Sequence, residues 1–263
     1  MRAAKLSDKT ALVTGASSGI GRACAIRLAR DGARLVLHGR RREALEETAS
    51  LIGGARIIDA DLTDPAARSS FCARALDELE SLDILVHNAG IGILAPSDST
   101  DPDHARNLLA LNFLAPVEIT RQLLPLMRPG GSIVMVSSIA GKLSLPGMGV
   151  YASSKHALNA YANILRGELR ERGIHVMSFC PGYVRTPFMS NMLQGASAAP
   201  LPGRMRFALT PDQCAEAIHS GIRKRKRTVV LPRLGWLVVA AERLCPALVN
   251  SAMSRAMRRD GRG

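Results

Sequence analysis

"TALVTGASSGIG", residues 10–21, joins a short apolar run to a glycine-rich turn. The run ends at Gly15, and the segment 21–32 that follows has helical spacing and stops at Gly32. This order predicts a buried strand, a tight turn and a helix, which begin a βαβ unit.

The turn contains two further glycines, Gly19 and Gly21. Glycines allow a sharp turn and let a pyrophosphate approach the backbone at a helix N-terminus, where free N–H groups and the helix dipole favour anions. The spacing is GxxxGxG rather than the common GxGxxG, so a plain turn is an alternative interpretation. Its place between the first strand and the first helix favours a dinucleotide site.

Apolar runs and helical patterns alternate along the rest of the body. Strands are predicted at 33–39, 55–62, 82–90, 131–138, 173–182 and 227–232. Helices are predicted at 41–52, 65–80, 101–127 and 149–172, and a last one follows the N-cap residue Thr210. This alternation predicts an α/β, Rossmann-type, doubly wound and mostly parallel seven-stranded sheet with helices on both faces. Its ligand should lie beyond the carboxyl ends of the strands.

Composition limits the class of protein. The 263 residues suit one large α/β domain or two small ones. The five cysteines are scattered, odd in number and never spaced CxxC, which argues for a reducing compartment and against a disulfide frame or a metal site. The N-terminal apolar run is too short for a signal peptide, and no run reaches the ~20 apolar residues of a membrane span. We therefore expect a cytoplasmic protein.

Tyr151 and Lys155 form the most informative pair. The lysine lies one helical turn after the tyrosine, on the same helix face. A positive charge there favours the phenolate and would bring the tyrosine pKa, ordinarily near ~10, toward neutrality. Taken alone, the spacing is better explained by an exposed surface pair.

Further motifs decide between these interpretations, and they are "TGASSGIG" (14–21), "DADL" (59–62), "NAG" (88–90), Asn112, "SS" (137–138), "YASSK" (151–155) and "PGYVRT" (181–186). In this order and spacing, the chain resembles the classical subgroup of the short-chain dehydrogenase/reductase family from about residue 8 to 231. Residues 1–232 are accordingly assigned to an NADP-binding domain that includes the catalytic site, and 233–263 to a C-terminal extension.

The resemblance implies four catalytic residues. Tyr151 would be the general acid/base, and Lys155 would lower its pKa and bind the nicotinamide ribose. Ser138, rather than Ser137, would hydrogen-bond the substrate oxygen. Asn112 would bind a water that links Lys155 to solvent. Pro116 supports this last role, because it has no N–H for the Asn112 carbonyl; a simple kink is the alternative.

The resemblance also implies a cofactor site. It would comprise Gly15, Ser17, Ser18, Gly19, Ile20, Gly21, Asp61, Leu62, Asn88, Ala89, Gly90, Tyr151, Lys155, Pro181, Gly182 and Thr186. His87 stands where many family members have asparagine, and we interpret it as a packing residue.

The end of the second strand indicates which nicotinamide cofactor is used. NAD-dependent members of this fold usually place an acid there, whereas this chain has Gly39 followed by Arg40, Arg41 and Arg42. Cations at a helix N-terminus are unfavourable unless an anion is present. We therefore expect NADP(H) to be preferred over NAD(H), with Arg40 and then Arg41 at the 2′-phosphate. A solvated basic surface is the alternative.

The substrate is less defined. The resemblance implies reduction of a ketone or aldehyde, or oxidation of the matching secondary alcohol, in a site lined by 139–148 and 183–210. These segments include Met148, Phe188, Met189, Met192, Leu193, Met205 and Phe207. Flexible thioethers suit an adaptable apolar pocket and hence a hydrophobic substrate, although ordinary loop packing explains them too.

The net charge of +13 is concentrated in the last part of the chain, since eleven Lys/Arg and two Asp/Glu follow from Arg223 onward. The uncharged segment 234–241 requires burial, and Pro246 should interrupt any long helix there. Three interpretations compete: a contact in a homodimer or homotetramer, a lid, and a peripheral membrane patch. A protein contact that buries the Trp236 region is favoured. Nucleic acid is not an expected partner, because no aromatic residue interrupts "RKRKR".

A different class of function is also considered. A protein of this fold could sense NADP(H), or act as a scaffold, without turnover. The presence of Ser138, Tyr151, Lys155 and Asn112 argues for an enzyme.

Overall fold

The computed structural model describes residues 6–194 and 208–260. Seven parallel strands form one sheet in the order β3-β2-β1-β4-β6-β7-β9. Their bounds are β1 Thr10–Thr14, β2 Arg34–Gly39, β3 Arg56–Asp59, β4 Leu82–His87, β6 Met127–Val136, β7 His175–Pro181 and β9 Thr228–Leu231. The predicted Rossmann-type fold is confirmed.

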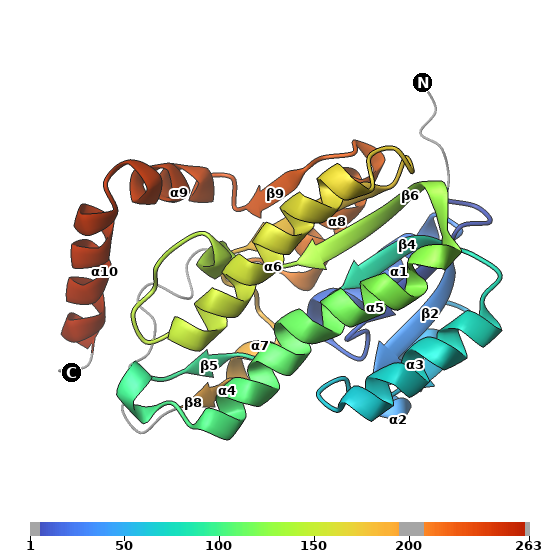
Figure 1. Cartoon of the computed structure of the whole chain (residues 1–263), viewed down its shortest axis with the longest axis horizontal. Coiled ribbons are helices and arrows are strands. Elements are labelled where there is room, and N and C mark those ends of the chain that lie inside the picture. The colour runs from blue at the N-terminus through green and yellow to red at the C-terminus, as the bar shows by residue number, and fades with distance from the viewer. Residues whose placement is uncertain (1–5, 195–207, 261–263) are drawn as a thin grey trace.

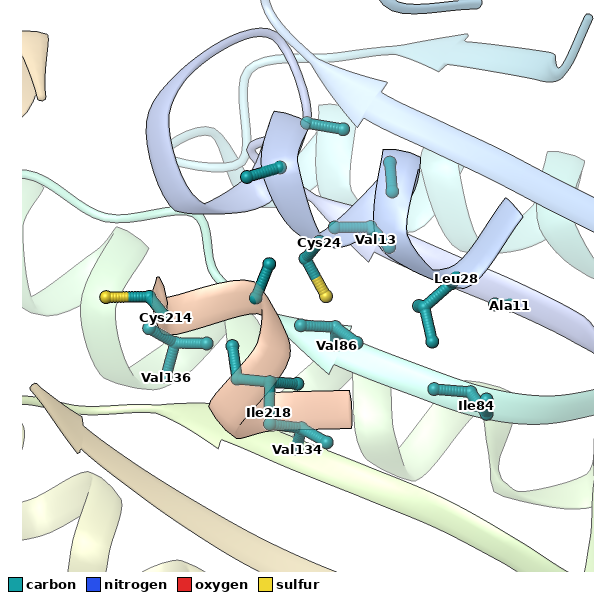
Figure 2. Packing of buried hydrophobic residues seen from close by; sticks show 14 of the residues in the cluster. Ala11, Val13, Cys24, Leu28, Ile84, Val86, Val134, Val136, Cys214 and Ile218 are labelled. Carbon is teal, nitrogen blue, oxygen red and sulfur yellow. The ribbon is translucent and has the colours of Figure 1, made fainter. Parts of the chain in front are cut away.

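Helices cover both faces of the sheet (Figure 1). One face carries α1 Gly19–Arg30, α2 Arg42–Ser50 and α8 Pro211–Arg223, and the other carries α3 Pro65–Glu78, α5 Ala115–Leu123 and α6 Gly149–Glu168. Buried strand residues alternate between the two cores: Ala11 and Val13 pack against α1, whereas Leu12 packs on the opposite face. Figure 2 shows Cys24 and Leu28 of α1 and Ile218 of α8 facing the strands.

The segment predicted as one helix over 101–127 is divided. It contains α4 Pro102–Leu109, a π-helical turn at Ala110–Leu114, α5, and a 3-10 turn at Leu124–Leu126, while Met127 already begins β6. Pro116 lies just after the π turn, and the wider turn accommodates a proline that cannot donate to the helix. The turn also places Asn112 inward, with its side chain fully buried.

A two-stranded sheet near the site was not predicted. Its strands are β5 Ile93–Leu94 and β8 Leu193–Gln194, which pair in parallel. The short helix α7 Pro187–Ser190 precedes β8. This pairing joins the segment after β7 to the segment after β4, so these two loops lie side by side although β6 separates the two strands in the main sheet.

The C-terminal segment forms two helices at one end of the sheet, α9 Gly235–Leu244 and α10 Pro246–Asp260 (Figure 1). Pro246 separates them, as predicted. Within the chain, 40% of Trp236 is exposed, so the described residues do not bury it, and its burial in a subunit contact stays a prediction. The face of α9 that packs on the body comprises Gly235, Val239 and Glu242 instead.

Candidate active site

The glycine turn lies beyond the carboxyl end of β1. Gly15 and Gly19 adopt φ values of +67° and +54°, which favour glycine. A Cβ on Gly21 would lie 2.1 Å from the Gly15 carbonyl oxygen, so the helix starts directly against the turn. Glycine is required at these positions by geometry, as the sequence predicted.

The first turn of α1 suits a phosphate. Its N-cap residue Ser18 makes no side-chain capping hydrogen bond, and Ser17, Ser18 and Ile20 are partly exposed. The N–H groups at this helix end are therefore available to an anion, which the helix dipole also favours. The residues present fit the pyrophosphate of a dinucleotide.

Asn88 fastens the end of β4 to this turn. Its Nδ2 donates to the carbonyl oxygens of Thr14 and Gly15, each at 3.0 Å. The Thr14 hydroxyl oxygen accepts the N–H groups of Asn88 and Ala89 at 3.0 and 3.1 Å. Sequence reasoning found Asn88, whereas Thr14 was recognised only as part of the motif 14–21 and its hydroxyl was assigned no role.

Asn112 holds the loop after β4 by hydrogen bonds to its backbone. Its Oδ1 accepts the Ile91 N–H and its Nδ2 donates to the Ile91 carbonyl, both at 2.9 Å. Nδ2 also donates to the Ser154 hydroxyl at 3.2 Å, and that hydroxyl donates to the Tyr151 carbonyl at 2.7 Å. Asn112 thus connects the β4 loop, which includes Gly90, to the helix of Tyr151.

Ser138, Tyr151 and Lys155 meet beyond the ends of β6 and β7. The Ser138 side chain lies close enough to the Tyr151 hydroxyl to lower the pKa of that tyrosine. The Lys155 Nζ lies 5.9 Å from the Tyr151 ring centroid and donates to the Val136 carbonyl at 3.1 Å. By contrast, the Ser137 hydroxyl donates to the Lys155 carbonyl at 3.2 Å. The Ser137 side chain therefore bonds to the backbone, and Ser138 is the serine that lies beside Tyr151.

The pKa of Tyr151 is shifted upward, opposite to the expected direction. Burial raises it to about 12, more than the Ser138 hydrogen bond lowers it. Burial also lowers the pKa of Lys155 to about 8. The expectation that Lys155 brings the Tyr151 pKa toward neutrality is therefore wrong for the polypeptide alone, because desolvation dominates and the amine is bonded to Val136 instead of the phenol.

An apolar cover causes this burial. Tyr151 is only 6% exposed and clusters with Met148, Met192, Phe188 and Met189. The rings of Tyr151 and Phe188 lie 6.0 Å apart between centroids. A Cβ on Gly92 would meet the Met192 Cε at 2.6 Å, which shows how closely the cover lies on the β4 loop. Of the expected lining, Met205 and Phe207 lie outside the described residues.

The lowered pKa of Lys155 predicts a pH-dependent stability. The unfolded chain keeps this proton up to a pKa of 10.5, whereas the folded chain releases it near 8. Between these values the folded state binds fewer protons, so its contribution to the free energy of unfolding rises with pH. Urea unfolding should show wild type gaining on the order of 2–3 kcal/mol over Lys155→Met between pH 7.5 and 10.5. The exposed Lys224→Met variant is the control, and a difference that stays constant with pH would contradict the burial of the Lys155 charge.

The second strand ends beside three arginines with different partners. Arg40 is exposed, with its Nη1 3.8 Å from the Asp61 Oδ2, and Arg42 pairs with Glu46 and Asp59. Arg41 is the exposed N-cap residue of α2. The Asp61 carboxylate accepts the Thr63 N–H and hydroxyl, and its pKa is lowered.

Leu62 and Asp61, the two residues expected at the adenine, differ in exposure. Its side chain is 2% exposed and belongs to the core, and its carbonyl accepts from the Arg68 guanidinium at 2.8 Å. Asp61 is therefore at the surface of the expected adenine site, whereas the Leu62 side chain points away from it.

The remaining cofactor positions follow β7. The Gly182 N–H donates to the Leu231 carbonyl at 2.7 Å, directly after Pro181. A Cβ on Gly19 would lie 3.1 Å from the Thr186 Cγ2. The loop after β7 thus reaches the glycine turn, and one continuous edge of the sheet carries the positions named from the sequence.

Two other features help to delimit the site. His87 is buried and pairs with the Thr120 hydroxyl at 2.9 Å, which confirms its packing role. A groove of about 470 Å³ lies between residues 143–146, the outer side of α6 and Asn250. Neither Tyr151 nor Lys155 lines that groove, so we place the candidate site at the catalytic pair and not in the groove.

Glu242 is a residue that sequence reasoning missed. It is 8% exposed, and its Oε1 accepts the Ser144 N–H at 3.1 Å. The C-terminal helix α9 is thereby attached to the segment 139–148, which leads from Ser138 to Tyr151. A single glutamate in an apolar segment gave no sign of this contact.

Comparison with known proteins identifies the family. The family description "short chain dehydrogenase" matches residues 9–196. The chain belongs to the short-chain dehydrogenase/reductase family. Bovine "Dehydrogenase/reductase SDR family member 7B" is 34% identical, covering 98% of this chain and 84% of its own. As in this family generally, the chain is an NAD(P)-dependent oxidoreductase.

Solved structures of this family share the fold. The angucycline C-6 ketoreductase LanV with bound NADP is 30% identical, with a TM-score of 0.74 over 87% of this chain and 96% of its own. A Burkholderia phymatum member in complex with NAD is 24% identical, with a TM-score of 0.82 over 93% of this chain and 96% of its own. At that identity the second likeness shows the fold alone.

Proposed function

We propose that this chain uses NADPH to reduce a hydrophobic ketone or aldehyde, with Tyr151 as the proton donor. The observation that supports it best is the meeting of Ser138, Tyr151 and Lys155 under an apolar cover, beside the glycine turn. The reverse reaction would oxidise the matching secondary alcohol. The similar ketoreductase LanV, which binds NADP, is consistent with this reaction class.

The chemistry follows from the positions of the protein's own groups. A bound nicotinamide cofactor would supply the hydride that the carbonyl carbon receives. The carbonyl π bond breaks as the oxygen takes the proton of the Tyr151 hydroxyl, and Ser138 orients that oxygen by a hydrogen bond. A tyrosine pKa of about 12 keeps this proton in place at neutral pH, which favours reduction. Lys155, protonated below about pH 8, would still favour the phenolate left behind, an effect that burial outweighs in the polypeptide alone.

The cofactor residues have separate proposed roles. The glycine turn with Ser17, Ser18 and Ile20 would bind the pyrophosphate, and Lys155 the nicotinamide ribose. Arg40, and next to it Arg41, would bind the 2′-phosphate, with Asp61 beside the adenine. Asn88, Ala89 and Gly90 would line the nucleotide, and Pro181, Gly182 and Thr186 the nicotinamide. Asn112 is proposed to hold a water for Lys155 as well as the loop contacts described above.

Location and assembly are part of the same proposal. Cys24, Cys72, Cys180 and Cys214 are buried and unpaired, which suits a reducing compartment such as the cytoplasm. β9 is an edge strand of the sheet, which supports a homodimer or homotetramer. Residues 1–232 would act as the catalytic domain, and 233–263 as an extension that contacts a membrane surface peripherally.

A substrate series tests the proposed function. NADPH oxidation is measured with linear 2-ketones and aldehydes of increasing chain length. Each methylene that enters an apolar pocket contributes ~0.8 kcal/mol, so kcat/KM should rise about threefold to fourfold per methylene until the pocket is full. Rates that do not change with chain length would contradict the hydrophobic substrate, and the absence of any NADPH oxidation would contradict carbonyl reduction.

A further inference from the structure

Helix α9 presents its apolar side chains outward. Leu234, Leu237 and Leu244 are 71%, 68% and 82% exposed, and Val238 is 38% exposed. The side that packs on the body contains Gly235, Val239 and the acidic Glu242. This distribution is the reverse of a surface helix, whose apolar stripe normally faces the core. The exposed side, Leu234, Leu237, Val238, Ala241 and Leu244, is called the outer face below.

The inner side of α9 is fixed, so the helix cannot rotate to bury its outer face. Glu242 accepts the Ser144 N–H at 3.1 Å. A Cβ on Gly235 would lie 2.8 Å from the Ile139 Cδ1, which indicates close packing. The Lys142 Nζ lies 6.0 Å from the Trp236 ring centroid. These contacts hold α9 against the segment 139–148, and nothing in residues 6–194 and 208–260 covers the outer face.

The exposed charges of the segment that carries the outer face have one sign. Arg233, Arg243 and Arg255 are exposed. Among the described side chains of residues 233–255, the one acid is Glu242, and it is buried. The basic run 223–227 lies at the other end of β9, so it does not contribute to this rim. The outer face thus belongs to a segment whose described exposed charges are all positive, although Arg243 lies on a different side of α9.

These charges distinguish two partners. In a two-fold dimer the same patch faces itself, and cations of one copy would meet those of the other without an acid to pair with. An anionic lipid surface complements both parts of the patch, because its interior takes the leucines and its headgroups take the arginines.

We propose that the outer face of α9, continued by the exposed Leu248 of α10, is a docking surface for anionic lipid membranes. The helix would lie in the plane of the interface, since its 10 residues are half of the ~20 required to span a bilayer. No helix in the described parts of the chain is long and apolar enough to cross one. The docking surface specifies the membrane contact proposed above and does not require that the enzyme reduce carbonyls.

Docking would also affect substrate access. The inner side of α9 contacts residues 139–148, which connect Ser138 to the helix of Tyr151. A membrane against the outer face would therefore lie near the substrate side of the site.

Vesicle flotation of the full chain tests the docking surface. The vesicles are phosphatidylcholine alone, or phosphatidylcholine with phosphatidylglycerol. We expect wild type to float with the anionic vesicles at least tenfold better than with the neutral ones, and this binding to weaken in high salt. Leu237→Ser with Leu244→Ser should reduce it at least tenfold, because two exposed leucines no longer enter the interface.

Matched controls distinguish docking through the outer face from nonspecific adsorption to vesicles. Leu51→Ser with Ile164→Ser removes two side chains that are 63% and 58% exposed elsewhere, and it should leave flotation unchanged. Arg233→Gln with Arg243→Gln should reduce binding to anionic vesicles about tenfold or more. Circular dichroism and thermal unfolding check that each variant folds, without any use of activity.

Two outcomes would overturn the proposal. One is wild type that fails to float, or floats equally well in all variants. The other is wild type that stays in solution as an oligomer which Leu237→Ser with Leu244→Ser dissociates in sedimentation, because the outer face would then join copies of the chain.

Discussion

Replacing Tyr151 by phenylalanine is expected to lower kcat by about 10²–10⁴-fold while the Kd for NADPH stays near that of wild type. The change removes the proton that reaches the carbonyl oxygen and keeps the ring that packs 6.0 Å from Phe188. Steady-state NADPH oxidation gives kcat, and fluorescence titration gives the Kd.

Tyr161→Phe is the control for this prediction. Tyr161 lies on the same helix, half-buried, with its ring 6.4 Å from Phe113. Its replacement should change kcat less than about threefold, since it is outside the catalytic group. Near-wild-type turnover in Tyr151→Phe would remove the tyrosine from the mechanism.

Replacing the residues expected to contact the adenosine ribose of the cofactor should change the preference for NADPH over NADH. Gly39→Asp with Arg40→Leu is expected to lower the preference for NADPH over NADH by about 10²–10³-fold. The change removes a charge-assisted bond to the 2′-phosphate, of the kind that contributes about 1.5–3 kcal/mol, and adds a carboxylate that accepts from a ribose diol. The ratio of kcat/KM for the two cofactors measures it.

The structure permits this exchange. A Cβ on Gly39 would lie 3.2 Å from the Leu45 Cδ2 and 3.4 Å from the Ser17 Oγ, so a small adjustment of Leu45 accommodates it. Arg42→Leu is the matched control, because Arg42 is already paired with Asp59 and Glu46. It should change the preference less than about twofold. A wild-type enzyme that binds NADH more tightly than NADPH would refute the role of Arg40.

The sheet was predictable because its strands are continuous apolar runs, most of them ended by glycine or proline. The same runs locate the strand ends, and with them Gly15, Asn88 and Ser138. The π turn at Ala110–Leu114 was not predictable, since helix periodicity tolerates one extra residue in a turn. Pro116 indicated an irregular helix there but not its kind.

The electrostatics of the catalytic pair could not be read from local sequence. The spacing of Tyr151 and Lys155 suggested a lowered tyrosine pKa. Burial reverses it, and that burial comes from Phe188 and Met192, which lie far along the chain and reach the site through the β5–β8 pairing. Local charge was visible in the sequence, whereas desolvation depends on tertiary contacts.

The orientation of α9 was hidden for a related reason. A segment apolar on nearly all sides does not reveal which side packs on the body. The contact between Glu242 and the Ser144 backbone fixes it, and this contact joins residues 98 apart in the chain. Sequence reasoning therefore favoured a buried Trp236 region, whereas the structure leaves the leucines outside.

Transfer of deuterium in a single turnover tests the central claim most directly. The enzyme is mixed with an equal amount of NADPH deuterated at the transferable C4 position and with the best ketone of the substrate series. Mass spectrometry should find one deuterium on the alcohol carbon for each NADPH oxidised in wild type, and none within the same time in Tyr151→Phe with NADPH bound. Alcohol without the label, or equally fast labelling by Tyr151→Phe, would contradict hydride transfer with Tyr151 as the proton donor.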